Sequence, residues 1–189
     1  MIGLYGSPSF SGVKDVTAPM KRAEMGGVLS TRELLTVAGV LRSAREVQSY
    51  GDGEAQGKEH IDFLFSRLTP DRALEERITN SIVSEEEIAD SASVELSNIR
   101  RLTRAANSRI REVLQKMITS THYASVLQEP IITMRGGRYV VPVKAEFKGA
   151  VSGLVHDISQ TGATVFIEPM QVVQANNEIR ELAAREKAE

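Results

Sequence analysis

Two stretches of the chain repeat apolar residues at helical spacing, and a strand-like segment lies between them. Residues 94–118 alternate steps of three and four, which predicts one long amphipathic helix. A second such stretch begins after Pro169. One apolar stripe cannot be buried alone, so we expect the two helices to pack together, antiparallel. The first stripe is expected to contain Leu96, Ile99, Ala106, Ile110, Val113 and Met117, and the second Val172, Val173, Asn176, Ile179, Leu182 and Ala183.

The segment between these helices, residues 129–169, reads as a small β-module. Three apolar runs, each bounded by Gly or Pro, predict strands at Tyr139–Val143, Val151–Val155 and Ala163–Ile167. The Gly136-Gly137 pair suits a type I′ hairpin, which needs positive φ at both central residues. The sequence therefore predicts antiparallel strands at the shared end of the two helices.

The first 90 residues predict short helices. Ser30 and Glu33 form a capping box for a helix that continues to about Tyr50. We expect the first twelve residues to be poorly ordered and the GDGEAQG segment (51–57) to break the chain. The other expected elements are helices at Lys14–Glu24, Asp62–Leu68 and Pro70–Ile82 and an acidic turn region at 83–92. The predicted fold class is α+β, mainly α: a helical core, long antiparallel helices and a small antiparallel β-module at their tip.

Composition narrows the function classes. The 189 residues include no Cys, which excludes disulfides, thiolate metal sites and Cys nucleophiles and fits a reducing cytoplasm. No signal peptide and no membrane-spanning run is evident, so we expect a cytoplasmic protein without a membrane partner. The net charge of −2 argues against a wholly basic nucleic-acid protein. Residues 98–116 nevertheless carry six Arg or Lys against one Glu.

Catalytic motifs are not found. The chain has no GxxxxGK[ST], GxGxxG, HExxH or GxSxG sequence. His156, Asp157 and Ser159 raise the alternative of a small hydrolase, but adjacent strand residues point to opposite faces, which weakens the pair. We favour a turn shaped by Asp157, Ser159, Gln160 and Thr161, and predict no catalytic residue, metal site or cofactor in this chain.

Cations of the β-module are the candidates for phosphate contact: Arg135, Arg138, Lys144, Lys148 and His156. The hairpin arginines could instead form a solvated turn. Lys144, Glu146 and Lys148 are expected on one strand face, where the glutamate favours a mixed solvated surface. In the long helix Arg100, Arg104 and Arg111 share a face while Arg101 and Arg109 are offset, and a solvated face is again the favoured interpretation.

Several strings of the chain resemble one family. The strings GRYVVPVKAEFKG, GLVHDISQTGATVFIEPMQVV and NNEIREL, with KRAEMGGVLSTRELL (21–35) and DSAS…IRR (90–101) before them, are similar to the second bacterial MutS family. These are the Smr-containing proteins linked to recombination suppression and to collided ribosomes. The resemblance covers most of residues 11–189 and is weakest at 51–70.

The resemblance implies a division into four parts. They are a helical core piece (1–90), a lever helix (91–129), a clamp-like β-module (130–169) and the start of a returning lever helix (170–189). The final REKAE lacks a stop signal, so we expect a piece of a longer protein.

By resemblance, the whole protein is a homodimeric ATPase and endonuclease that uses ATP and Mg. Both active sites would lie outside this chain, so this piece is expected not to be an enzyme. Its expected partners are duplex or branched DNA, with the ribosome and its rRNA as further candidates, bound through the backbone. The alternative is a coiled-coil scaffold whose β-module binds protein.

Overall fold

The computed structural model describes residues 9–51 and 62–189, and the chain divides into two compact units, Met1–Ser93 and Val94–Glu189. It is mainly helical with two small antiparallel sheets, which confirms the predicted fold class. The predictions of a disordered start and of a break at 51–57 fall largely outside the described residues. The finer four-part division stays a prediction.

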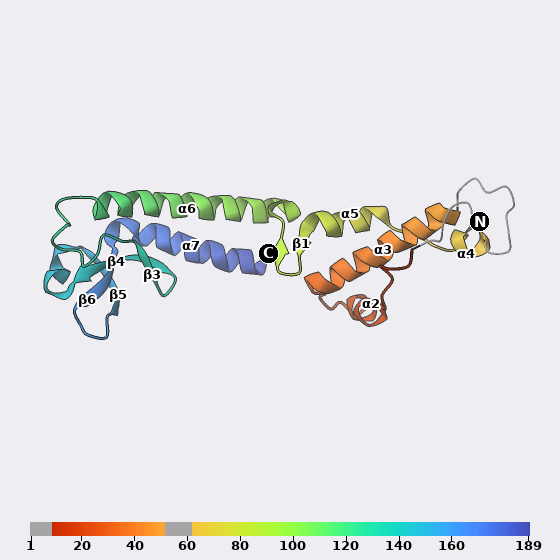
Figure 1. Ribbon diagram of the computed structural model, residues 1–189, viewed down its shortest axis with the longest axis horizontal. Coiled ribbons are helices and arrows are strands. Elements are labelled where there is room, and N and C mark those ends of the chain that lie inside the picture. Colours follow the sequence, from red (N-terminus) through yellow and green to blue (C-terminus); the bar gives the residue numbers. More distant parts are fainter. Residues whose placement is uncertain (1–8, 52–61) are drawn as a thin grey trace. The chain divides into compact units, whose positions relative to one another are not determined.

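The first unit is built from short helices and one small hairpin (Figure 1). The hairpin lies largely within the predicted acidic turn region. The sequence analysis did not predict its strands, because they are only three and two residues long. The first predicted helix begins three residues later than expected, at Thr17. The elements are α2 (Thr17–Glu24), α3 (Thr31–Gly51), α4 (Asp62–Ser66), α5 (Arg72–Ser81), β1 (Ile82–Ser84), β2 (Glu87–Ile88) and the 3-10 turn η1 (Asp90–Ala92).

The capping box at the start of α3 is confirmed. The Ser30 amide donates to Glu33 Oε2 over 2.9 Å, and the Glu33 amide donates back to Ser30 Oγ over 3.3 Å. Arg22 of α2 donates to the same carboxylate, 2.5 Å away. This bond, with those from Ser30, lowers the pKa of Glu33 to about 2. One carboxylate therefore caps the N-terminus of α3 and also connects this helix to α2.

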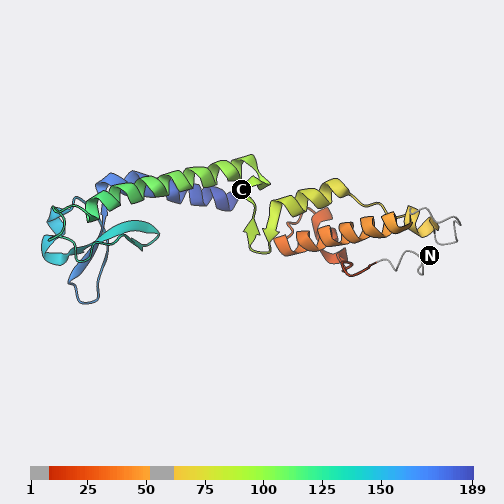
Figure 2. The ribbon, with the colours of Figure 1, turned by 45° about the horizontal axis from the view of Figure 1, so that its top comes forward.

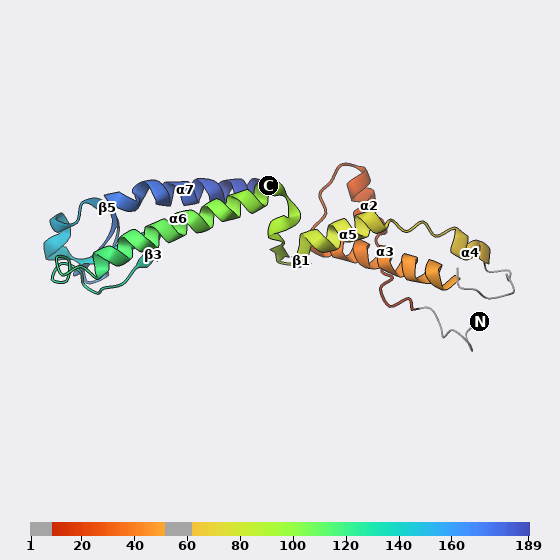
Figure 3. The ribbon, with the colours of Figure 1, turned by 90° about the horizontal axis from the view of Figure 1, so that it is seen from above.

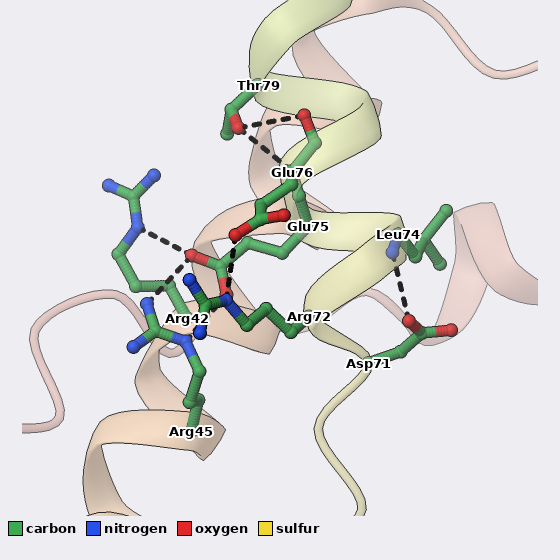
Figure 4. A network of polar contacts seen from close by, with 8 residues as sticks. All are labelled: Arg42, Arg45, Asp71, Arg72, Leu74, Glu75, Glu76 and Thr79. Atoms are coloured by element: carbon green, nitrogen blue, oxygen red, sulfur yellow. Dashed lines mark hydrogen bonds and ion pairs between the residues drawn. The ribbon is translucent and has the colours of Figure 1, made fainter.

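Helices α3 and α5 are joined by a carboxylate beside a small apolar core. The core contains Val37, Ala38, Ile78 and Ile82. Next to it the Glu75 side chain, only 7% exposed, accepts from Arg42 Nε at 3.1 Å and from Arg45 Nε at 3.0 Å (Figure 4). Arg45 Nη2 also donates to the carboxylate, so the pairing with Arg45 is bidentate. This cluster fixes the side-by-side arrangement of the two helices.

The second unit begins with the predicted helix pair. Helices α6 (Val94–Ile118) and α7 (Met170–Ala188) run antiparallel and lie side by side in all three ribbon views (Figures 1, 2 and 3). Ion pairs join them, and the pairs near the start of α6 meet the end of α7, as antiparallel packing requires. The pairs are Glu95–Arg185, Arg100–Glu186 and Arg109–Glu178.

The buried stripes differ from the prediction on both helices. Leu114, which the prediction omitted, is fully buried, whereas Val113 beside it is only half-buried. The β-module packs on this end of α6 and widens its buried face. On α7 the prediction was wrong for Ala183, which is exposed, because Leu182 alone fills that turn of the interface.

The β-module is a four-stranded antiparallel sheet in the order β3-β4-β6-β5. Val141, Val143 and Ile167 project from one face into a core shared with Ile110 and Leu114 of α6. The strands are β3 (Thr133–Arg135), β4 (Arg138–Lys144), β5 (Gly153–Ile158) and β6 (Thr164–Pro169), with the 3-10 turn η2 (Ala145–Ala150) between β4 and β5.

Two glycine positions are required by this sheet. Gly136 and Gly137 have φ of 56° and 75°, which confirms the predicted hairpin with positive φ at both centres. At Gly153 a Cβ would lie 2.2 Å from the backbone oxygen of Glu168. This close approach requires glycine at the first residue of β5, which starts at Gly153 and not at Val151 as expected.

The expectation that Lys144, Glu146 and Lys148 share a strand face is wrong. Strand β4 ends at Lys144, and the next six residues turn as η2. Strand alternation therefore does not apply to Glu146 and Lys148. Lys148 therefore lies outside the hydrogen-bonded ladder of β4, and Glu146 and Lys148 are both exposed.

We predict that Glu75→Gln destabilises the first unit by about 1.5–3 kcal/mol, because the neutral amide loses charge-assisted hydrogen bonds from two arginines. Urea unfolding measures the change. Glu76→Gln is the matched control, since Glu76 pairs with Arg72 on the surface and should cost less than about 0.5 kcal/mol. Equal midpoints for the two variants would contradict this role of Glu75.

The contribution of Glu75 is also expected to depend on pH. The hydrogen bond from Arg45, followed by that from Arg42, lowers the pKa of this carboxyl in the folded chain. A lowered folded pKa means that the contribution is complete above the unfolded pKa and disappears as pH falls through the folded one. The stability difference between the wild type and Glu75→Gln should therefore shrink below pH of about 4.3. A difference that stays constant down to pH of about 2 would refute it.

Candidate nucleic-acid interface

Three of the five candidate cations gather on the sheet beside the first turns of α7. Arg135 and Arg138 flank the Gly136-Gly137 turn and form a cross-strand pair. His156 lies in β5. The structure brings all three to neighbouring acidic partners.

Glu168 is the centre of this group. Its side chain is 0% exposed although it lies in an otherwise apolar strand. Arg138 Nη1 donates to Glu168 Oε1 over 2.7 Å, and Asn176 of α7 donates to the same oxygen over 2.8 Å. His156 Nε2 lies 2.5 Å from the other oxygen, Oε2. One carboxylate thus connects β4, β5, β6 and α7.

A β-bulge places His156 in this cluster. Val155 pairs with Ile167 and Asp157 with Phe166, so His156 is the extra residue of β5. Regular alternation of side chains between the two faces of the sheet is therefore interrupted at His156. The side chains of His156 and Asp157 still have different partners, since His156 contacts Glu168 and Asp157 pairs with Arg135.

Asn176 and Asn177 complete the attachment of the hairpin to α7. The Asn176 amide accepts from the Tyr139 amide over 3.1 Å and donates to the Tyr139 carbonyl over 3.2 Å. Asn177 accepts from Arg138 Nη2. Arg138 is left only 13% exposed, so it is held inside the module and not presented to solvent.

Arg135 is paired inside the module and also partly exposed to solvent. Its guanidinium carbon lies 3.9 Å from the centre of the Phe166 ring, and its Nε donates to Asp157 Oδ2 over 3.1 Å. The side chain remains 37% exposed. Internal ion pairs therefore engage both hairpin arginines, and only Arg135 also keeps a solvent-facing surface.

Lys144 and Lys148, which we call the tip lysines, differ from the other three. Lys144 Nζ donates to the Ser125 carbonyl over 2.9 Å, which holds it beside the loop that follows α6. Lys148 lies on η2, is exposed and forms no ion pair within residues 9–51 and 62–189. Neither lysine has a carboxylate partner among the described residues, so their charge is available to an external anion.

The geometry does not favour catalysis at His156. Its ring is committed to Glu168, and Ser159 Oγ accepts the Thr164 amide over 3.0 Å. The Asp157 carboxylate accepts the Ile158 amide over 2.9 Å, as expected for residues that shape a turn. Over the described part of the chain no cluster of potential metal ligands is present, and no helix there is long and apolar enough to cross a membrane.

Sequence reasoning missed the role of Glu168. The available signal was a single carboxylate within the apolar run Val165–Pro169, together with Asn176 in the apolar stripe of α7. Buried polar groups need partners, so such residues predict a polar contact inside the core. Which residues would meet them depends on the fold.

We predict that Arg138→Ala destabilises the second unit by about 3 kcal/mol, because it removes the arginine that pairs with a fully buried carboxylate. Chemical unfolding monitored by circular dichroism measures the loss. Arg180→Ala is the control, since Arg180 is an exposed residue of α7 without an ion pair in the described segments. A loss no larger than that of the control would show that Glu168 does not depend on Arg138.

Comparisons with known proteins show the family of the chain. No family model matches the chain. Three similar relatives are named endonuclease MutS2: those of Ruminiclostridium cellulolyticum (47% identical over 97% of this chain), Acetivibrio thermocellus (46% over 100%) and Clostridium beijerinckii (46% over 97%). The chain spans about a quarter of the length of these relatives, 23–24%. This chain therefore belongs to the MutS2 family, as the counterpart of that quarter.

Proposed function

We propose that this chain is the core, lever and clamp part of a MutS2-type protein and that its β-module holds the backbone of nucleic acid. The observation that carries the proposal is the pair of tip lysines beyond the C-terminal end of α6, without carboxylate partners among the described residues. A clamp that holds duplex without reading its sequence needs cations against phosphates and no base-edge donors.

The five candidate cations then have different roles. Lys144 and Lys148 contact phosphate, and Arg135 adds a contact through its exposed edge. Arg138 and His156 hold the module together. Turning Arg138 outward would leave the buried Glu168 without its arginine, which costs more than one surface phosphate contact returns.

The levers α6 and α7 give this tip a fixed support. Their apolar seam and three interhelical ion pairs join them along their length, and Glu168 connects the sheet to the start of α7. A movement applied to the levers would be carried to the clamp. In the whole protein we propose that an ATPase with ATP and Mg supplies this movement, that a separate endonuclease domain performs cleavage, and that the protein works as a cytoplasmic homodimer.

The ligand class follows from the same chemistry. Phosphates of duplex or branched DNA would satisfy the lysines, and so would those of ribosomal RNA on a collided ribosome. The rival is a scaffold whose β-module binds protein, and salt dependence separates the two. Phosphate-driven binding weakens steeply with salt, whereas a largely apolar protein contact does not.

We expect Lys144→Gln/Lys148→Gln to weaken duplex binding about tenfold near 0.1 M salt. Since each lysine neutralises about one phosphate, the log–log salt slope should fall by about 1.8. Fluorescence anisotropy with a labelled duplex at several salt concentrations measures both quantities.

The matched control is Lys14→Gln/Lys21→Gln, which removes the same charge from the first unit. Wild-type affinity in the tip-lysine variant, or equal losses in both variants, would argue against the proposed contact. A binding curve for the wild type that does not change with salt would favour the protein-binding scaffold.

A further inference from the structure

Two polar loops meet at the Lys144 end of the sheet. Lys144 of β4 pairs with Thr164, the first residue of β6. The Ala145 amide donates to the Ala163 carbonyl over 2.9 Å, which brings the turn between β5 and β6 beside this end of β4. The loop after α6 reaches the same place, because Lys144 Nζ donates to the Ser125 carbonyl over 2.9 Å. The two loops are therefore neighbours around Lys144.

These loops, residues 119–128 and 159–164, differ from the rest of the chain in composition. Neither contains Asp, Glu, Lys or Arg, although these types make up 25% of the chain. Seven of their sixteen residues are Ser or Thr, whose hydroxyl groups donate and accept hydrogen bonds without carrying a charge. This end of the module therefore offers neutral hydrogen-bonding groups around one lysine.

Local hydrogen bonds engage only part of this set. Ser159 Oγ accepts the Thr164 amide over 3.0 Å, which closes the turn between β5 and β6. Thr161 Oγ1 has only long contacts, 3.4 Å to Ser159 Oγ and 3.5 Å from the Ala163 amide. Three other exposed side chains of the loops form no hydrogen bond with the described residues. With Thr161 they make up what we call the neutral surface: Thr121, Ser125, Gln160 and Thr161.

The turn is also open to a close approach. Gly162 has a φ of 73°, and no atom lies within 4 Å of the place that a Cβ would occupy. The backbone of the turn is therefore uncovered beside Gln160 and Thr161, and an extended ligand can reach both side chains and the chain between them.

Charge at this end is modest. Lys144 and Lys148 supply two positive charges, and Glu146, which is exposed and lies between them in the chain, supplies a negative one. Duplex DNA carries one charge for about every 1.7 Å of its axis, so these lysines offset only a few phosphates. Ser, Thr and Gln side chains also bind phosphate and sugar oxygens, and such contacts fix the position of a protein on a duplex. The neutral surface supplies this second type of contact.

We infer that the neutral surface contacts the sugar-phosphate backbone of the nucleic acid that the tip lysines hold. The inference rests on the proposed function and deepens it, because it adds uncharged hydrogen-bonding groups from two loops to the same site. The lysines attract the polyanion, and the hydroxyl and amide groups fix its position across the end of the sheet.

The two kinds of contact respond differently to salt. Cations that neutralise phosphates release counterions, so the log–log salt slope reports their number. Hydroxyl and amide groups release none. Loss of the neutral surface should therefore weaken binding by the same factor at every salt concentration.

The first test is Gln160→Ala/Thr161→Ala, with the labelled duplex used for the tip-lysine variant. We expect about five- to tenfold weaker binding, since two hydrogen-bonding groups are lost, and the salt slope of the wild type. Thermal unfolding should match the wild type, because the internal contacts of Thr161 are long. Wild-type affinity, or a slope that falls as far as in the tip-lysine variant, overturns the inference.

The matched control is Gln171→Ala/Gln174→Ala, which removes two exposed amides from the first turns of α7. The length of β6, six residues or about 17 Å, lies between these positions and the neutral surface. The control should bind like the wild type. A loss equal to that of Gln160→Ala/Thr161→Ala overturns the inference.

The tip-lysine variant separates the two proposals. If that variant loses affinity while Gln160→Ala/Thr161→Ala does not, the lysine contact stands and the neutral contact is refuted. If Gln160→Ala/Thr161→Ala alone loses affinity, the neutral contact stands and the proposed role of the lysines is refuted.

A second measurement detects proximity directly and needs no loss of affinity. The chain has no cysteine, so Gln160→Cys introduces one unique thiol to carry a photo-crosslinker. We expect cross-linking to the duplex from this position and none from Gln174→Cys on α7. Equal yields at the two positions, or no product at position 160, would overturn the inference.

Discussion

The second unit depends on a carboxylate that is removed from water. Glu168 is the penultimate residue of β6 and lies between Ile167 and Pro169, and its charge has to be balanced inside the protein because the side chain is fully buried. Arg138 supplies the opposite charge, and His156 and Asn176 supply further hydrogen-bond partners, so the contacts come from three different elements. Because a buried charge tolerates little displacement of its partners, the hairpin, the edge strand and α7 are fixed relative to one another.

This constraint also decides which cations remain for a ligand. From the sequence alone, the five candidate cations of the β-module cannot be told apart as ligand contacts. Burial of Glu168 engages two of them, and Asp157 and Phe166 engage most of a third. Lys144 and Lys148 lie at the end of β4 and on η2, beyond the reach of both carboxylates. The division between structural and available charge is therefore a consequence of the fold.

Periodicity predicted the helices and the hairpin well, because those features depend on neighbours in sequence. The bounds of α6, the capping box at Ser30 and the positive φ at Gly136-Gly137 are of this kind. The bulge at His156, the 3-10 turn after Lys144 and the burial of Leu114 depend on contacts between distant segments. No local pattern in the chain contains that information, which is why the predicted strand face of Lys144, Glu146 and Lys148 was wrong.

The helix pair shows the same distinction for charge. Arg100 and Arg101 are neighbours of one type, yet a rotation of about 100° per residue sends one to Glu186 of α7 and the other toward solvent. Both residues carry a positive charge, and only the position of α7 determines that Arg100 forms an ion pair with this helix while Arg101 is exposed. The arginines that meet glutamates of α7 stabilise the helix pair. The net charge of −2 therefore does not tell which arginines stabilise the helix pair, because that depends on where α7 lies.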